Sequence, residues 1–308
     1  MAILVVGLAI VGVGLFHRSA PVAGPGPGGS APPGPSASGT TTAGATAGWD
    51  AAQQQRFAAA SALIATKSGH VGIVVRDRQT GLVWRGGEAE FPIWAGSTPK
   101  LAFAVALREE ARAGEITLDA TANAQIAKML NVSDNNSADT LWNRYAKQPA
   151  TWMKRFQDRY GMTGATYVAG FPNRWGFVKC SAQDLANLMS YILDKLDPND
   201  RSYITTAMQS VGSVQQWGVW GVGPALHPGV KDGWSVEKDD GKDHWITATV
   251  GFVGTGQRYV VAAMYHQLPG GDSISEGVHA SPQRTANAAA SRSRSSIRTH
   301  AASRWGSR

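Results

Sequence analysis

The 308-residue sequence contains one cysteine, Cys180, and this scarcity excludes an internal disulfide and a cysteine-rich metal site. Its seven histidines show no H-E-x-x-H or comparable ligand spacing. A glycine-rich phosphate loop is also missing from the sequence. We therefore expect no metal and no cofactor.

Acidic residues are absent from both ends of the chain. Residues 1–48 and 281–308 hold seven of the 29 Lys and Arg and none of the 22 Asp and Glu. Taking those seven from 29 leaves 22 basic and 22 acidic residues in 49–280, so the net charge of +7 comes entirely from the ends. A basic face for nucleic acid is therefore not expected on the folded body.

The N-terminal residues indicate export. Residues 3–16 form an uncharged apolar run of 14, shorter than the roughly 20 that a spanning helix needs. Residues 19–48 are almost wholly Ala, Gly, Pro, Ser and Thr. We interpret 1–18 as a signal peptide or signal anchor and 19–48 as a disordered linker. This predicts an extracytoplasmic protein, secreted or held at the cell membrane by its N-terminal segment.

The C-terminal residues, 281–308, contain mainly Ala, Ser and Arg. We expect a basic disordered tail, and a basic arm for anionic surface polymer or lipid is the alternative.

The body, 49–280, alternates between strand-like and helix-like patterns. Strands are expected at 71–76, 82–85, 229–236, 245–253 and 258–265. Helices are expected at 50–66, 100–113, 122–130, 136–147, 149–160 and 181–196, with another beginning near Ile274. The order predicts an α+β fold, in which helices flank an antiparallel five-stranded sheet and an all-helical lobe stands beside it.

Three short motifs occur in order along this body. They are an S-x-x-K at Ser97–Lys100, an S-D-N at Ser133–Asn135, and Lys231-Asp232-Gly233, which is close to K-T-G. Each motif alone is common. Their setting adds weight, because Ser97 precedes a helix, Ser133 lies between two helices and Lys231 lies on a strand.

The chemistry of these residues suits acyl transfer. Ser97 and Lys100 share one helix face, so Lys100 is a candidate base for a Ser97 nucleophile. Ser133 can pass a proton to a leaving nitrogen, and Lys231 can favour that transfer. Asn135 can hold a substrate amide, and Gly233 lets a substrate backbone lie close to its strand.

Over roughly 70–280, the sequence resembles class A β-lactamases and penicillin-binding proteins, through these motifs and the helix start at Ser181. The resemblance implies a β-lactamase/transpeptidase-like fold with two lobes. It also implies acylation of Ser97 by a β-lactam or a D-alanyl-type amide, and so a small-molecule or peptidoglycan-derived substrate. The backbone N–H groups of Ser97 and Trp234 would form the oxyanion hole. Asp232 and Gly233 would lie at the substrate.

The sequence departs from that family at three points. The stretch 164–179 lacks the Glu that directs the deacylating water in class A enzymes. Asp232 replaces a hydroxyl that would bind a substrate carboxylate, so either its side chain points away or the ligand is neutral or cationic there. Ser97 and Ser133 are 36 residues apart, which predicts a trimmed helical lobe.

Three functions remain open. The first is a serine hydrolase that is acylated at Ser97 and deacylates slowly or by a non-standard route. The second is a catalytically inert cell-envelope binding protein that keeps the fold. The third is an esterase or amidase acting on a small neutral ligand.

Overall fold

The computed structural model describes residues 45–238 and 240–270. The expected signal segment, most of the linker, the helix near Ile274 and the basic tail lie outside these residues. Within the described part of the chain, no helix is long and apolar enough to span a bilayer.

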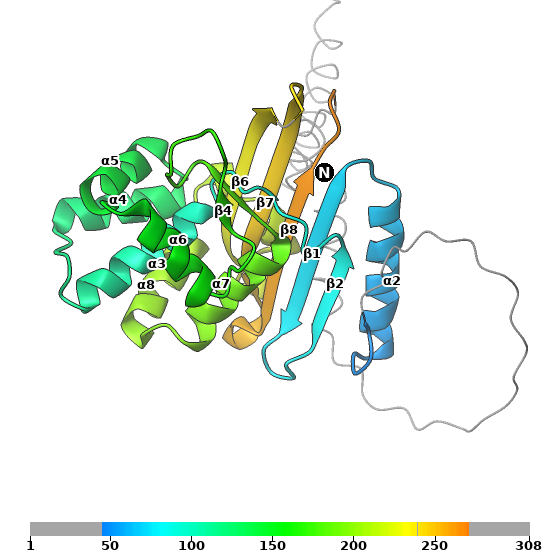
Figure 1. Cartoon of the computed structure of the whole chain (residues 1–308). Helices are drawn as coiled ribbons and strands as arrows, with labels where there is room; N and C mark the ends of the chain where they lie inside the picture. The colour runs from blue at the N-terminus through cyan, green and yellow to red at the C-terminus, as the bar shows by residue number, and fades with distance from the viewer. Residues whose placement is uncertain (1–44, 239, 271–308) are drawn as a thin grey trace, which may run out of the picture.

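A five-stranded antiparallel sheet forms the centre of the fold, with strand order β2-β1-β8-β7-β6 (Figure 1). The strands are β1 His70–Asp77, β2 Val83–Gly87, β6 Gly229–Lys238, β7 Asp243–Val253 and β8 Tyr259–His266. These are the five strands predicted from the sequence, and the α+β class is confirmed. Strands β7 and β8 are almost continuously buried, and their long apolar runs are why the sequence pattern identified them.

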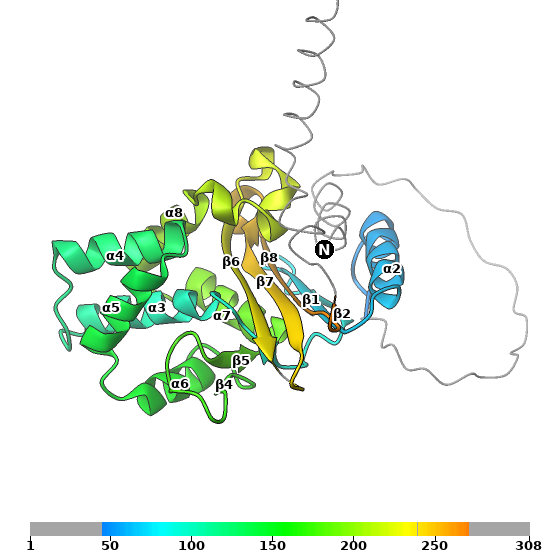
Figure 2. The same cartoon turned by 90° about the horizontal axis from the view of Figure 1, so that it is seen from above.

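One face of the sheet is covered by α2, Ala51–Ala65 (Figure 2). Asp50 begins this helix with a capping box, in which its carboxylate accepts from the Gln53 backbone N–H at 2.8 Å. Phe57 of α2 is fully buried between the helix and the sheet and stacks on Trp84 of β2, with 4.5 Å between the ring centroids. This packing fixes α2 against the β1–β2 edge of the sheet.

The opposite face meets a larger set of helices and the main hydrophobic core (Figure 2). These helices are α3 Pro99–Arg112, α4 Ala120–Asn131, α5 Asn135–Tyr145, α6 Pro149–Asp158, α7 Ala182–Asp194 and α8 Pro198–Gln209. The helical lobe was predicted, except for α8, to which no separate helix was assigned. The sequence marks its start only by Asp197 as cap and Pro198 in the first turn.

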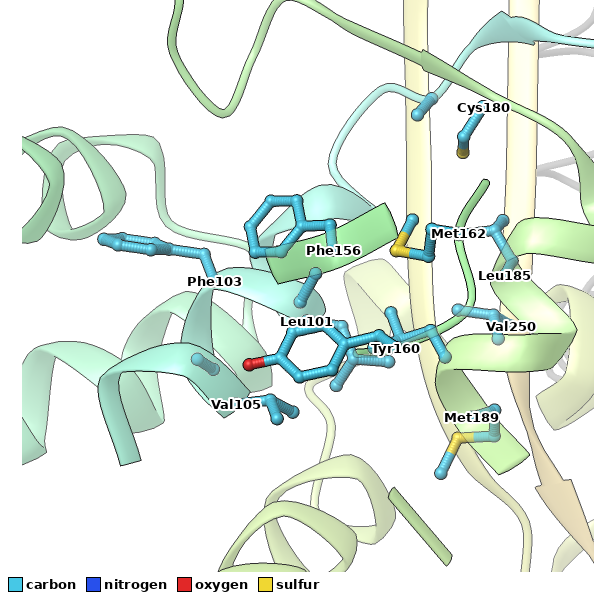
Figure 3. Packing of buried hydrophobic residues seen from close by; sticks show 14 of the residues in the cluster. Leu101, Phe103, Val105, Phe156, Tyr160, Met162, Cys180, Leu185, Met189 and Val250 are labelled. Carbon is cyan, nitrogen blue, oxygen red and sulfur yellow. The ribbon is translucent and has the colours of Figure 1, made fainter. Parts of the chain in front are cut away.

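Helix α3 runs through the middle of this core. Its first nine residues, Pro99 to Leu107, are all buried, as its apolar pattern on every side predicted. Figure 3 shows Leu101, Phe103 and Val105 of α3 among side chains of the other helices and of Val250 on β7. Lys100 is the one charged side chain within this buried stretch.

A second, three-stranded sheet was not predicted. It has the order β3-β5-β4 and consists of β3 Ile93–Trp94, β4 Thr166–Tyr167 and β5 Val178–Cys180. Strands of two or three residues are too short to leave a periodic signal. The sheet ties the stretch 164–179 to the chain just before α3, where the Ala95 N–H donates to the Val178 carbonyl at 3.0 Å.

Short 3₁₀ turns complete the described fold: η1 Ser213–Gln215, η2 Gly218–Val222, η3 Pro224–Leu226 and η4 Thr255–Gln257. The last of these follows Gly254 and forms the tight connection between β7 and β8. Elements η1 and η2 contact β6, which is the edge strand beside the helical lobe.

Candidate active site

Ser97 lies immediately before the first turn of α3. Pro99 occupies the first helical position, where a missing N–H costs nothing. Lys100 follows it, three residues after Ser97 and on the same side of the helix as Ser97. The Ser97 Oγ and Lys100 Nζ atoms are 3.1 Å apart. The pair predicted from S-x-x-K therefore meets at hydrogen-bond distance.

Oxygen atoms surround the Lys100 amine. Its Nζ lies 2.7 Å from the Ser133 carbonyl, 2.6 Å from Asn135 Oδ1 and 3.3 Å from Ser133 Oγ. The carbonyl and the amide oxygen only accept, so they take two N–H bonds. A neutral amine then keeps its lone pair for a hydroxyl proton, and Ser97 Oγ is the nearer hydroxyl.

Burial prepares Lys100 to act as a base. Its side chain has no exposed surface, and desolvation lowers its pKa to about 7, although the charges of Asp134 and Asp139 oppose this shift. Near neutral pH, a large fraction of Lys100 is therefore uncharged and able to accept the Ser97 proton.

Ser133 stands between two lysines. It has a left-handed backbone with φ of 59°, which is strained for a residue with a Cβ. The conformation is imposed by the sharp turn from α4 into α5, where Asp134 caps α5 by accepting from the Ser137 N–H at 2.8 Å. The turn places Ser133 Oγ 3.0 Å from Lys231 Nζ, in addition to its 3.3 Å distance from Lys100 Nζ.

Lys231 is fully buried on β6 and is held by Gln215, a residue that no sequence motif singled out. Gln215 in η1 accepts from Lys231 Nζ at 2.5 Å and from the Asp232 N–H at 3.1 Å. Its amide nitrogen donates to the Leu130 carbonyl at 2.5 Å. Burial and the neighbouring charge of Lys100 lower the Lys231 pKa well below its usual value.

Asp232 lies on the other face of β6 from Lys231, because successive side chains of a strand point to opposite faces. It is fully buried opposite Thr249 of β7, and neither of its carboxylate oxygens has a partner with good hydrogen-bond geometry. Desolvation raises its pKa well above the usual range, although the Thr249 hydroxyl and the Trp217 backbone lie near enough to oppose the shift. Of the two alternatives predicted for Asp232, the structure shows the one in which its side chain points away from Ser97.

The strand β6 passes very close to the residues before α3. A Cβ on Gly233 would lie 2.5 Å from the Ser97 backbone nitrogen, and a Cβ on Gly96 would lie 2.8 Å from the Trp234 nitrogen. The Asp232 N–H points away from β7 to Gln215, so by strand alternation the Trp234 N–H also points to this free edge. The Ser97 and Trp234 nitrogens thus lie on either side of one narrow approach, while the Trp234 ring contacts Trp217.

The stretch 164–179 brings a tryptophan to Lys100 where a carboxylate was missing. The Trp175 ring centroid lies 4.4 Å from Lys100 Nζ, and its Nε1–H donates to Asp139 Oδ1 at 2.8 Å. Nothing in the spacing of the stretch distinguishes Trp175 from Phe171 or Phe177, so sequence reasoning did not find it.

Within residues 45–238 and 240–270, no group of three or more His, Cys, Asp and Glu side chains is arranged to hold a metal ion. Cys180 is fully buried, and its thiol pKa is raised by desolvation and by the charge of Asp184.

No family model and no curated protein sequence matches this chain. Solved structures do match it. A β-lactamase from Chitinophaga pinensis DSM 2588 is 18% identical, with a TM-score of 0.56 over 70% of this chain and 91% of that one. The TLA-3 extended-spectrum β-lactamase is 14% identical, with a TM-score of 0.58 over 69% and 90%. PBP-A is 19% identical, with a TM-score of 0.52 over 67% and 84%.

These matches establish the fold and no more than the fold, because all three identities are low. The chain has a β-lactamase/transpeptidase-like fold, as the resemblance of its motifs implied.

Proposed function

We propose that this protein is an exported serine hydrolase or acyl transferase of the β-lactamase and penicillin-binding-protein kind. Its Ser97 is acylated by a β-lactam or by a D-alanyl-type amide derived from peptidoglycan. The observation that carries the proposal is the chain of contacts from Ser97 Oγ through Lys100 Nζ and Ser133 Oγ to Lys231 Nζ, with distances of 3.1, 3.3 and 3.0 Å.

Acylation uses this chain in one direction. Neutral Lys100 takes the hydroxyl proton as Ser97 Oγ attacks the substrate carbonyl. The Ser97 and Trp234 N–H groups stabilise the oxyanion that develops. The proton then moves from Lys100 through the Ser133 hydroxyl to the leaving nitrogen, and the carbon–nitrogen bond breaks.

Substrate positioning would fall to Asn135 and to the free edge of β6. The Asn135 side chain is exposed, although its Oδ1 is bound to Lys100, so its amide nitrogen remains available for a substrate carbonyl. Asp232 contributes indirectly, by closing the other face of β6 beneath Lys231.

Deacylation is expected to be slow. Water needs a base beside the acyl carbonyl, and 164–179 contains no carboxylate to serve as one. Transfer to an amine acceptor, which is a stronger nucleophile than water, is the alternative exit from the acyl-enzyme.

The proposal is tested with residues 49–280 and benzylpenicillin, followed by intact-protein mass spectrometry over hours. We expect a mass increase equal to the whole penicillin, persisting for many minutes, and absent from Ser97→Ala. Ser61→Ala, which changes a serine on α2, is the matched control and should label like the parent. No adduct on folded parent protein contradicts acylation by penicillins.

The inert binding protein is the second candidate, and Asp232 favours it because its carboxyl is buried on the face of β6 away from Ser97 and so offers no donor to a substrate carboxylate. Neutral aryl esters distinguish it from the third candidate. Ester turnover that is lost in Ser97→Ala, without penicillin labelling, would identify an esterase or amidase.

A further inference from the structure

The loop between β4 and β5 forms a cover over the base of the proposed reaction. It is tethered at both sides, since Val168 N–H donates to the Phe177 carbonyl and Phe177 N–H to the Arg174 carbonyl, each at 3.0 Å. Trp175 points inward from this loop and is only 8% exposed. Its ring faces the Lys100 amine at 4.4 Å.

Helix α5 holds this tryptophan in place. Asn135 and Asp139 are four residues apart and therefore share one face of α5. Asn135 contacts Lys100 directly, whereas Asp139 reaches it through Trp175, by accepting the indole Nε1–H at 2.8 Å. Asp139 also pairs with Arg174, the residue before the tryptophan.

The indole closes the remaining side of the Lys100 amine. Oxygens of Ser97, Ser133 and Asn135 occupy its hydrogen-bonding directions, and the Trp175 ring lies against it as well. The one polar atom of the indole faces Asp139, so Lys100 meets the face of the ring, which excludes water without offering the amine an oxygen or nitrogen partner. Lys100 consequently has no exposed surface.

We propose that Trp175, positioned by Asp139, shields Lys100 from water and thereby prolongs the life of the Ser97 acyl-enzyme. This inference rests on the proposed function and deepens it. Hydrolysis requires a water oxygen to bond to the acyl carbon while a base takes its proton. The carbon–Oγ bond then breaks, the proton returns to Ser97 Oγ, and the acyl group leaves as a carboxylic acid. Lys100 is the base beside the ester, and the shield keeps water from it.

The lifetime of the penicillin adduct tests the shield. At a pH where Lys100 is neutral in both proteins, we expect Trp175→Ala to shorten the half-life by about tenfold or more, which corresponds to a barrier change of about 1.4 kcal/mol. Asp139→Ala and Trp175→Phe should shorten it less, because each leaves an aromatic ring near Lys100. Phe171→Ala changes an exposed residue of the same loop that contacts Phe177 and should leave the half-life unchanged.

The pH dependence of acylation shows whether Trp175 shields Lys100 or only maintains the structure of its loop. For the parent, the rate should rise with pH and reach half its plateau near 7, where Lys100 becomes neutral. In Trp175→Ala, water returns to the amine, its pKa rises and the midpoint should move upward. The charged groups around Lys100 are Asp134, Asp139 and Lys231, and this variant keeps all of them.

An unchanged half-life and midpoint in natively folded Trp175→Ala would overturn the shield. Near-UV circular dichroism checks the fold, and Trp175→Phe supplies the same comparison if the alanine variant unfolds.

If no penicillin adduct forms on any variant, the proposed function fails and the acyl-enzyme lifetime has no meaning. Reductive methylation with formaldehyde then tests the shield alone, through the rate at which the Lys100 peptide is labelled in the natively folded protein. Faster labelling of Lys100 in Trp175→Ala than in the parent supports shielding, and equal rates refute it.

Discussion

Three ionisable side chains at the site, those of Lys100, Lys231 and Asp232, have no exposed surface at all. In each case burial favours the neutral form, so it lowers the pKa of the two lysines and raises the pKa of the carboxyl. For Lys100, desolvation is the largest cause of the lowered pKa, and the charges of Asp134 and Asp139 raise that pKa instead.

Ser133 combines a strained backbone with a hydroxyl between two lysines, and substitutions separate the two properties. Glycine accepts φ of 59° without strain, whereas alanine keeps the Cβ and loses only the hydroxyl. We expect Ser133→Gly to be about 1 kcal/mol more stable than Ser133→Ala in urea unfolding.

In both Ser133 variants the rate of acylation should fall by roughly 100-fold, as expected when a positioned proton-transfer group is removed. Stopped-flow mixing with a chromogenic cephalosporin measures this rate. A normal rate in either variant would show that the proton reaches the leaving nitrogen by another route.

Single residues of the site were predictable where they belonged to a motif of known order. Ser97, Lys100, Ser133, Asn135 and Lys231 all meet in the structure. Gln215 and Trp175 were not predictable, because Gln215 reaches its lysine from a single 3₁₀ turn and Trp175 from a loop. Their side chains look ordinary along the sequence, and only the tertiary fold brings them to the site.

At the scale of elements, the site depends on how closely β6 approaches the start of α3. Gly233 is the point of contact, whereas the role expected for it from the sequence was to leave room for a substrate backbone. A Cβ there would meet the Ser97 nitrogen at 2.5 Å, and backbone cannot give way as a flexible side chain does.

We therefore expect Gly233→Ala to destabilise the protein by roughly 1–3 kcal/mol, as overpacking does. It should also slow penicillin labelling more than the stability loss explains, because the Ser97 and Trp234 N–H groups would separate. Gly176→Ala is the control, since a Cβ at Gly176 meets nothing within 4 Å. Equal labelling by the two variants would mean that the close approach has no part in acylation.

The main elements were predictable from periodicity, and the small ones were not. The strands from β6 to β8 have eight to eleven residues, long enough for their apolar pattern to stand out. Strands β3, β4 and β5 have two or three residues and exist because neighbouring chain pairs with them. It is this small sheet that carries Trp175 to Lys100.

For the whole molecule, the buried lysine makes stability depend on pH. The Lys100 pKa is about 7 in the folded state against 10.5 unfolded, so the unfolded chain binds more protons between those values. The free-energy cost of burying Lys100 has its full size below pH 7 and disappears as the pH approaches 10.5. Stability should therefore rise by about 1 kcal/mol per pH unit from this residue between pH 7 and 9.

Lys100→Met supplies the comparison, because it fills the same space without a titrating group. Urea unfolding at pH 7, 8 and 9 should give a steeper rise for the parent than for this variant. Both proteins keep Asp232, but losing the Lys100 charge lets the Lys231 pKa rise in the variant, so the difference between the two curves reports Lys100 together with its effect on Lys231. Parallel curves would show that Lys100 keeps its ordinary pKa in the folded protein.

The pairing of β1 with β8 also determines when the domain can assemble. Val71 lies beside Tyr265, and Asp77 beside Tyr259, so β1 can pair fully only after β8 has been synthesised. Contacts this distant in sequence form slowly, because a long loop must close before they contribute. During synthesis, the segment bearing Ser97 emerges well before β8 exists to pair with β1. Ser97 is thus made early and becomes part of the candidate site only after nearly the whole domain has been translated.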